Sequence, residues 1–208
     1  MQARCYYYDT TELEDSVLFE YGISILPWND RIQKISRYVF DRDKRLCLGA
    51  GLLLRHMLPE AGITDMSVDT DDNGKPFLTN NDKLFFNLSH DGDIAVCVLS
   101  DGPVGVDVCA DRKFDKGIAD LAFSGEERAY IEQSDNKDEA FTEIWAEKES
   151  YLKMAGTGLL RDPKSVTVMN MDCFSKIRIP GYQIVVCTLS PGEVSFTEWR
   201  LKNTQGEV

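Results

Sequence analysis

The chain has 208 residues, enough for one large domain or for two halves of roughly 100 residues each. Hydrophobic residues make up 43% of it, which is ordinary for a globular protein and argues against wholesale disorder. Acidic residues outnumber basic ones by 35 to 23, and the net charge of −12 argues against general binding to nucleic acid or to an anionic membrane, since both need a basic surface.

The N-terminal segment lacks the apolar core of a signal peptide, and no uncharged apolar run approaches the roughly 18 residues of a membrane span. The six cysteines are scattered and form no C-x-x-C pair. We therefore expect reduced thiols in a cytoplasmic protein, with Cys97, Cys109 and Cys187 acting as small hydrophobic residues in strands.

Apolar periodicity and turn residues predict the elements of the first half of the chain. In chain order we expect a strand at 4–8, a helix at 42–58, a turn at 73–76, strands at 84–86 and 94–99 separated by the polar turn 89–93, and a strand at 104–108.

The second half begins with a helical texture and then returns to strands. Ser124 and Glu127 have the spacing of a capping box, so a helix should begin there. A longer helix is predicted over 139–155, ended by the glycine-containing segment 156–158. Strands are predicted at 166–169 and 182–189.

Two segments of the chain resemble each other. Asp93–Ser100 reads DIAVCVLS and Gln183–Ser190 reads QIVVCTLS. Two related α+β halves, 1–104 and 105–208, would explain this similarity, although short apolar strands also look alike by chance. Two such halves within one chain would make a monomer sufficient.

Asp107 stands in the segment VGVDV, where every neighbour favours a buried strand. A buried lone carboxylate is costly unless it is paired, hydrogen-bonded or bound to a metal. The alternative is an aspartate at a strand end that faces solvent.

Trp145, Glu149 and Lys153 are four residues apart, so on a helix they share one face. The simplest explanation is a surface Glu–Lys pair, worth a few tenths of a kcal/mol. A large aromatic residue on the same face indicates a cleft instead. A magnesium ion needs only one or two carboxylates beside substrate phosphates, and a nearby lysine could neutralise a phosphate. Composition and spacing alone lead no further than a site for phosphate chemistry.

Three motifs occur in a fixed order: FNLSH at 86–90, VGVD at 104–107, and the pattern W-x-x-K-E-S-x-x-K-x-x-G-x-G-L at 145–159. Together with NGKP at 73–76 they resemble the Sfp-type 4′-phosphopantetheinyl transferase family, which activates the carrier proteins of nonribosomal peptide, polyketide and fatty acid synthesis. The resemblance extends from about residue 31 to 159, with a compatible strand pattern to the end.

The resemblance implies two similar α+β halves with the active site between them. It implies transfer of the phosphopantetheine arm of coenzyme A to a serine of an apo acyl or peptidyl carrier protein, with adenosine 3′,5′-bisphosphate as the leaving group. In this family pattern, Asp107 would bind Mg²⁺ and Glu149 would be a second metal ligand and the general base. Lys153 would contact the pyrophosphate and assist departure of the leaving group.

The resemblance also implies a coenzyme A site. Ser89 and His90 match residues that hold the 3′-phosphate, with Arg45 beside them, and the segment Gly74, Lys75 and Pro76 matches the wall on the adenine side. Arg31 and Lys34 are candidate phosphate contacts, with a solvated helix face as the alternative. We expect His90 to lie in a polar turn suited to ligand contact, and His56 to be structural.

Two positions depart from the family pattern. Cys109 stands where a third carboxylate is common, and a thiol is a poor ligand for hard Mg²⁺, so we expect weaker metal binding without loss of activity. Asp91 stands where a serine often follows the histidine, and it must be paired or point away from a phosphate.

Two other functions fit some of the same residues. A metal-dependent nuclease also uses an aspartate on a strand with a glutamate and a lysine, but the acidic balance and the helical Glu149–Lys153 spacing oppose it. A non-catalytic module that binds coenzyme A would be supported only by Cys109. The sequence does not identify the carrier or the pathway.

Overall fold

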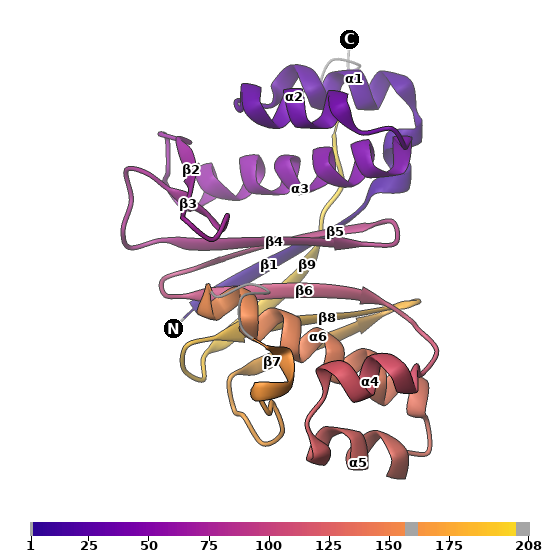
Figure 1. The fold of residues 1–208 in the computed structure, drawn as a ribbon. Helices are drawn as coiled ribbons and strands as arrows, with labels where there is room; N and C mark the ends of the chain where they lie inside the picture. Colours follow the sequence, from indigo (N-terminus) through magenta and orange to yellow (C-terminus); the bar gives the residue numbers. More distant parts are fainter. Residues whose placement is uncertain (1, 157–161, 203–208) are drawn as a thin grey trace.

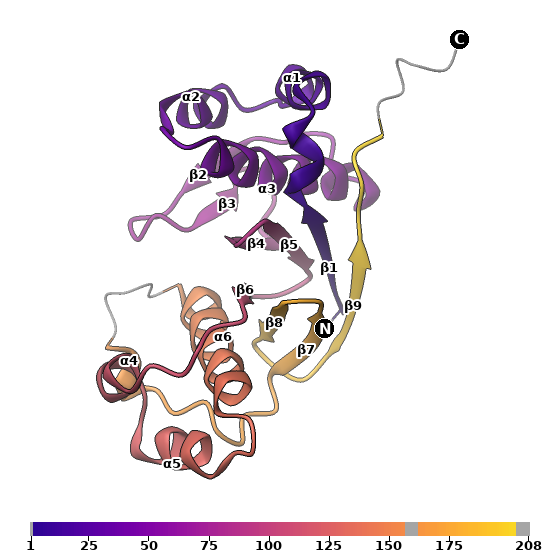
Figure 2. The ribbon, with the colours of Figure 1, turned by 90° about the vertical axis from the view of Figure 1, so that its right-hand side faces the viewer.

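The computed structural model describes residues 2–156 and 162–202. In that part of the chain, helices and sheets stack in four layers, with helices on the two outer sides and two sheets in the middle (Figures 1 and 2). Its helices are each too short or too polar to cross a membrane.

The first half forms the upper layers of Figure 1. In chain order its elements are β1 (Gln2–Asp9), a 3₁₀ helix (Thr10–Glu14), α1 (Ser16–Ile25), α2 (Asn29–Arg37), α3 (Asp41–Glu60), β2 (Val68–Thr70), β3 (Pro76–Leu78), β4 (Phe85–Asp91) and β5 (Ile94–Ser100).

The second half forms the lower layers and ends with a strand that returns upward. Its elements are β6 (Val104–Ala110), α4 (Lys116–Ala122), α5 (Gly125–Gln133), α6 (Lys137–Ala155), a 3₁₀ helix (Pro163–Ser165), β7 (Phe174–Ile179), β8 (Tyr182–Thr188) and β9 (Glu193–Glu198).

The two main sheets have the same topology. One has the strand order β4-β5-β1-β9 and the other has the order β6-β8-β7. In each half a strand is followed by helices and then by an antiparallel pair, and the last strand of that pair lies between the other two. The similar segments 93–100 and 183–190 fall on these central strands, β5 and β8. The predicted α+β fold of two similar halves is confirmed.

The halves meet through a mainly aliphatic layer between the sheets. It includes Val96 and Val98 of β5, Val104 and Val106 of β6, and Val186 of β8, all with no exposed surface. Outer cores lie beneath α3 and beside α6. The parallel pairing of β9 with β1 carries the end of the chain back to the first sheet. The division of the chain at residues 104 and 105 stays a prediction.

Two predicted elements are wrong. Residues 89–91 are not part of a turn but continue β4, so that only Gly92 and Asp93 make the turn to β5; Gly92 has the left-handed φ of 60° that glycine adopts without strain. Residues 166–169 do not form a strand. Val166 and Val168 are buried in an irregular segment, where the Val168 amide donates to the Glu127 carboxylate. Apolar alternation there reflects burial of a loop.

The predicted capping box at Ser124 is confirmed, since its hydroxyl accepts from the Glu127 amide and the Glu127 carboxylate accepts from the Ser124 amide. The predicted long helix is also confirmed and ends at Gly156, which has a left-handed φ of 68°. Residues 157 and 158 of the predicted helix stop lie outside the described residues.

Candidate active site

Polar side chains of β4 connect the two halves beside the cleft. Asn87, Ser89 and Asp91 alternate along the strand and therefore face the same side. The Val106 amide donates to Asn87 Oδ1 at 2.9 Å, and the Ala110 amide donates to Asp91 Oδ2 at 2.9 Å. These side chains thus satisfy backbone groups of β6, across the boundary between the sheets.

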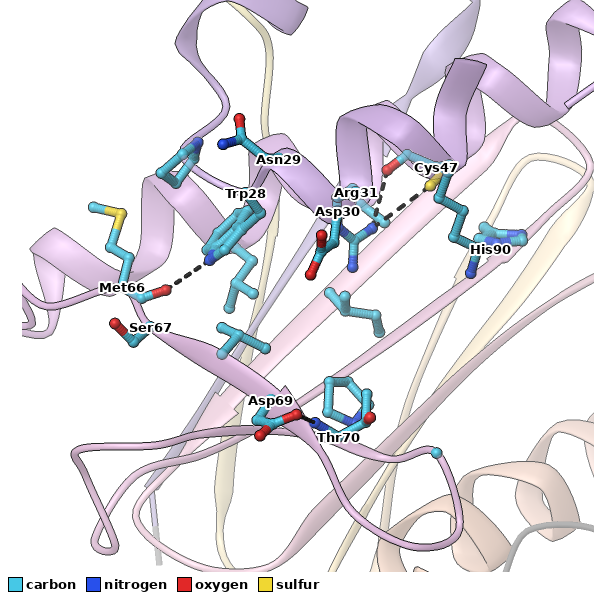
Figure 3. A pocket seen from close by; sticks show the side chains of 18 of the residues that line it. Trp28, Asn29, Asp30, Arg31, Cys47, Met66, Ser67, Asp69, Thr70 and His90 are labelled. Atoms are coloured by element: carbon cyan, nitrogen blue, oxygen red, sulfur yellow. Dashed lines mark hydrogen bonds between the residues drawn. The ribbon is translucent and has the colours of Figure 1, made fainter. Parts of the chain in front are cut away.

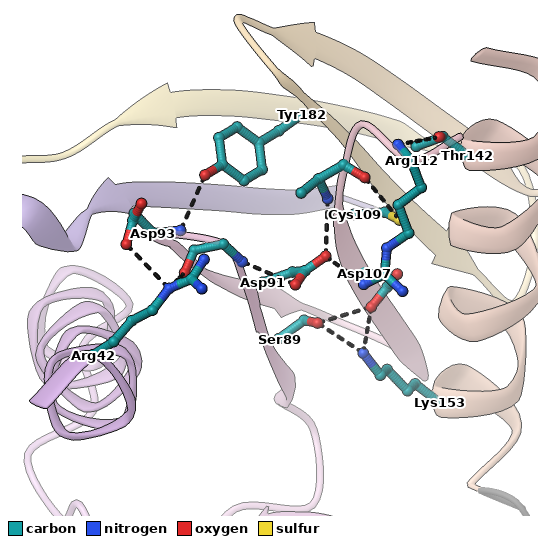
Figure 4. A network of polar contacts seen from close by, with 12 residues as sticks. Arg42, Ser89, Asp91, Asp93, Asp107, Cys109, Arg112, Thr142, Lys153 and Tyr182 are labelled. Carbon is teal, nitrogen blue, oxygen red and sulfur yellow. Dashed lines mark hydrogen bonds and ion pairs between the residues drawn. The ribbon is translucent and has the colours of Figure 1, made fainter. Parts of the chain in front are cut away.

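Asp107 lies at the centre of this contact (Figure 4). Its Oδ1 accepts a hydrogen bond from Ser89 Oγ at 2.8 Å and pairs with Lys153 Nζ at 2.6 Å. Lys153 Nζ also donates to Ser89 Oγ at 2.8 Å. The Asp107 side chain is only 8% exposed, so the alternative of a solvent-facing aspartate is wrong. Three elements, β4, β6 and α6, thereby converge on one carboxylate.

Gly105 explains how α6 comes so close to β6. A Cβ at this position would overlap the Ser150 carbonyl oxygen and the Met154 nitrogen of the helix. Only a glycine lets the helix backbone rest directly on the strand. Because Lys153 stands beside Met154, this approach puts its ammonium within reach of Asp107, two residues along the strand.

Glu149 lies one helical turn before Lys153 and is half-buried. Burial and then the negative charge of Asp107 raise the pKa of the Glu149 carboxyl, while Lys153 opposes the rise. The two carboxylates therefore interact electrostatically. A carboxylate with a raised pKa is a better proton acceptor than an ordinary glutamate.

A cavity of about 1070 Å³ opens beside this cluster. It has an apolar side, where Trp28 donates its indole N–H to the Met66 carbonyl at 2.6 Å (Figure 3). Four basic side chains also line it, Arg31, Lys34, His90 and Lys153, together with the carboxylates of Asp30, Asp65 and Asp69. Apolar and basic side chains around one cavity suit a ligand that combines a flat ring with phosphates.

His90 lines the cavity and stands on β4, not in a turn as predicted. Desolvation, and then the positive charge of Lys153 with smaller effects of Lys34 and Arg31, lowers the pKa of His90, although a backbone hydrogen bond opposes this. Four basic side chains thus line one cavity, as is typical of a site that binds an anion.

Comparison with known proteins agrees with this geometry. Residues 103–185 match the model of the 4′-phosphopantetheinyl transferase superfamily, and residues 16–101 match that of the 4′-phosphopantetheinyl transferase N-terminal domain. A 4′-phosphopantetheinyl transferase of Bacillus pumilus is 31% identical over an alignment of 183 residues that covers 78% of this chain and 78% of its own. This chain belongs to the 4′-phosphopantetheinyl transferase superfamily. It is therefore an enzyme of the transferase class.

More distant relatives are similar as well. The 4′-phosphopantetheinyl transferase Sfp of Bacillus subtilis is 25% identical over 183 residues, covering 78% of this chain and 82% of its own. An L-aminoadipate-semialdehyde dehydrogenase-phosphopantetheinyl transferase of Xenopus laevis is 30% identical over 146 residues, covering 61% and 48%.

The residues expected to bind coenzyme A in this phosphopantetheinyl transferase fall into two groups. Gly74, Pro76, Ser89, His90 and Lys153 line the cavity. Arg31 and Lys34 line it too, with Arg31 half-buried and Lys34 exposed, and their phosphate contacts stay predictions.

Arg45 and Lys75 are placed differently. Arg45 pairs with Glu14 at 3.1 Å and its side chain is 15% exposed. The ammonium of Lys75 donates to backbone carbonyls at the end of α6. The ligand contacts of both residues stay predictions.

The two departures from the family pattern have clear positions. Cys109 is buried beside Ala146 and Val185. Burial raises the pKa of its thiol to about 12, so it is a neutral thiol at physiological pH. Asp91 is paired as expected, since Arg112 Nη2 lies 2.7 Å from its Oδ2. Burial opposes ionisation of Asp91, but hydrogen bonds from Arg112 and Ala110 lower its pKa overall.

Sequence reasoning missed a buried ion pair of the transferase. Lys148, within the third motif, lies 2.8 Å from the Glu127 carboxylate, and their side chains are 3% and 0% exposed. Lys148 also donates to the carbonyls of Pro163 and Val166. The capping box had drawn attention to Glu127, but no local signal connects it with a lysine 21 positions later.

Proposed function

We propose that this transferase moves the 4′-phosphopantetheine arm of coenzyme A to a serine hydroxyl of an apo acyl or peptidyl carrier protein and releases adenosine 3′,5′-bisphosphate. One observation carries the proposal. Ser89, Asp107 and Lys153 converge within 2.6 to 2.8 Å of one another beside a cavity lined in part by basic side chains.

The chain's own residues divide the chemistry as follows. The carrier serine oxygen forms a bond to the β-phosphorus, and the bond from that phosphorus to the bridging pyrophosphate oxygen breaks. Glu149 accepts the serine proton directly or through water, as its raised pKa favours. The electron pair leaves with adenosine 3′,5′-bisphosphate, and the Lys153 ammonium offsets the charge that develops there.

Asp107 and Glu149 fit a magnesium ion. They are hard oxygen donors placed close enough for the charge of one to raise the pKa of the other. Over residues 2–156 and 162–202 no group of three or more His, Cys, Asp or Glu side chains is arranged to hold a metal, so water and phosphate oxygens would complete the coordination. When bound, Mg²⁺ supplies positive charge to the pyrophosphate.

Cys109 should leave this magnesium site weaker than one with three carboxylates. Measuring the Mg²⁺ dependence of wild type and Cys109→Glu tests this expectation, and no gain in metal affinity would count against it.

The cavity is the proposed coenzyme A site. His90 and Ser89, supported by Arg31 and Lys34, would hold the 3′-phosphate, while Gly74 and Pro76 would contact the adenine side. Direct binding by Arg45 is proposed on family resemblance alone. The same resemblance implies a contact of Lys75, whose ammonium donates instead to carbonyls at the end of α6. We further propose that the protein is cytoplasmic. We propose a monomer, since one chain supplies both sides of the cleft. We also propose that it has no nucleic acid partner, since the chain is acidic.

The test is incubation of the protein with coenzyme A, Mg²⁺ and a panel of apo carrier proteins, followed by intact-mass measurement. We expect at least one carrier to gain the mass of one phosphopantetheine arm. No mass gain on any carrier, with coenzyme A binding intact, would favour a non-catalytic binding module. Cleavage of plasmid DNA in a parallel reaction would favour a nuclease.

A further inference from the structure

Lys75 connects the rim of the cavity with the helix that carries Glu149 and Lys153. Its Nζ donates to the Lys153 carbonyl at 2.6 Å and to the Met154 carbonyl at 3.2 Å, and it also reaches the Val104 carbonyl at 3.3 Å. These first two carbonyls belong to the last turn of α6, where the helix dipole is negative, and the Lys153 carbonyl also accepts from the Gly156 amide at 3.3 Å. A lysine ammonium is well matched to this end.

The turn that presents Lys75 is tightly hydrogen-bonded. Asp71 Oδ1 accepts from the amides of Asn73 and Lys75, at 2.9 and 2.8 Å, and the Asp71 carbonyl accepts from the Gly74 amide. Asn73 makes a second contact with the same helix end, where its Nδ2 donates to the Gly156 carbonyl at 2.8 Å. The turn therefore contacts the C-terminal end of α6 through two side chains, Asn73 and Lys75.

The neighbours of Lys75 on both sides face the cavity. Gly74 and Pro76 line it, whereas the Lys75 side chain points to α6. Lys153 has a matching double role, since its carbonyl accepts from Lys75 while its ammonium meets Asp107 and Ser89. A ligand that contacts Gly74 and Pro76 thus touches the two residues next to Lys75, and the Lys75 ammonium is hydrogen-bonded to Lys153.

We propose that Lys75 is a positioning residue: it fixes the last turn of α6, and thereby the Lys153 ammonium, and couples this turn to occupation of the coenzyme A cavity. This inference rests on the proposed function for its ligand. It differs from the direct adenine contact that the family resemblance implies for the same residue. Desolvation lowers the pKa of Lys75, with Asp71 opposing, in keeping with an ammonium used inside the protein.

The activity test compares Lys75→Met with Lys75→Arg and with Lys83→Met, an exposed lysine that serves as matched control. Lys75→Met should lower kcat about tenfold to a hundredfold with less than a threefold change in KM for coenzyme A, because misplacement of a catalytic group by about 1 Å has effects of this size. Lys75→Arg should restore most of kcat, and Lys83→Met should behave as wild type.

Combining the change with Lys153→Ala separates positioning from contact. If Lys75 acts through Lys153, Lys75→Met should cost less than twofold in kcat once Lys153 is absent. An equal loss in both backgrounds overturns the proposal. So does a Lys75→Met variant whose KM and dissociation constant for coenzyme A rise at unchanged kcat, because that pattern marks a ligand contact.

Hydrogen–deuterium exchange provides a readout that needs no transfer reaction. Coenzyme A should slow exchange of the amides of residues 151–155 in wild type and in Lys83→Met, and should leave it unchanged in Lys75→Met. No slowing in wild type overturns the coupling. If wild type modifies no carrier but shows this protection, the proposed function fails while the role of Lys75 stands.

Discussion

The two halves share one topology but use corresponding positions differently. Tyr8 of β1 lies opposite Ala95, and Asp107 of β6 lies opposite Val185. Because segment 93–100 corresponds to 183–190, Ala95 matches Val185, and Tyr8 therefore matches Asp107. Tyr8 is fully buried against α3, whereas Asp107 binds the ammonium of Lys153. One half fills this position with an aromatic ring and the other with a carboxylate that pairs with a lysine.

In each half a glycine allows a helix to pack closely against a strand, but the two glycines lie on different elements. In the first half the glycine is on the helix, where a Cβ at Gly49 would stand 2.6 Å from Thr10 Cγ2 and 3.2 Å from the Tyr8 ring. In the second half the glycine is on the strand, at Gly105, and the helix keeps its side chains. The duplicated architecture thus forms a packed core in one half and one side of the candidate site in the other.

We expect the largest difference in activity between variants at the matched positions Tyr8 and Asp107. Asp107→Ala and Glu149→Gln should each reduce carrier modification about a thousandfold, because the first removes a proposed metal ligand and the second the proposed base. Tyr8→Phe should change the rate less than twofold. The measurement is the initial rate of mass gain on a carrier protein. A Glu149→Gln variant that keeps a tenth of wild-type activity would contradict its role as base.

The two glycines give the next contrast. Gly105→Ala should lower activity about a hundredfold, since the added methyl group must push α6 and Lys153 away from Asp107. Gly49→Ala should lower stability by about 1–3 kcal/mol and leave kcat of the folded fraction within threefold. Urea unfolding and kcat, measured on both variants, show whether each glycine serves stability or activity. Equal losses of kcat would remove the distinction between the halves.

The buried ion pair of the second half should contribute to stability more than to catalysis. Lys148→Met leaves the Glu127 carboxylate buried without its cation, and we expect a loss of about 3 kcal/mol in the free energy of unfolding. The double variant with Glu127→Gln should recover part of that loss. A Lys148→Met protein of wild-type stability with greatly reduced kcat would instead place Lys148 in the reaction.

His90 gives the smallest expected effect, and it belongs to the first half. Its pKa is lowered, so in the free protein the ring is neutral near pH 7. A bound 3′-phosphate favours the protonated ring, so the preference for coenzyme A over 3′-dephospho-coenzyme A should rise several-fold as the pH falls from 8 to about 6. Calorimetric titration measures both dissociation constants, and His90→Ala should lose the trend. An unchanged trend in that variant would exclude His90 from the phosphate site.

The lowered pKa of His90 also affects the free energy of unfolding: a fall in pH strengthens the preference for coenzyme A but lowers the stability of the fold. A lowered pKa in the folded chain means that the unfolded chain binds the proton more readily. The contribution of His90 is therefore complete above about pH 6.5 and is lost as the pH falls below it.

Local signals made part of this structure predictable. The helix beginning at Gly125 follows from the Ser124–Glu127 spacing, and α3 and α6 follow from apolar periodicity and a glycine stop. Asp107 was conspicuous because a carboxylate among valines needs a partner. Its burial and its pairing with Lys153 confirm that reasoning.

Contacts between distant residues were not predictable in this way. Nothing in segment 193–198 indicates that it pairs in parallel with β1, since its partner is nearly 200 residues earlier. Likewise, the polar residues 89–91 look like a turn until Ser89 is seen to donate to Asp107 of β6 and Asp91 to accept from the Ala110 amide. Family resemblance predicts Lys75 as a ligand contact, whereas in the structure its ammonium donates to carbonyls at the end of α6.

The return of β9 to the first sheet determines how the cleft can move. The chain crosses between the halves twice, at 100–104 and at 188–193, and the two crossings touch where the Leu189 amide donates to the Pro103 carbonyl at 3.3 Å. If the halves move, two adjacent connections would favour rotation about a single axis over twisting of one half against the other, and the buried aliphatic layer would limit the size of that rotation. We expect the cleft to open and close along one angular coordinate. Spin labels on α3 and α6 should therefore show one correlated change of distance on binding coenzyme A; independent changes at two label pairs would contradict a single axis.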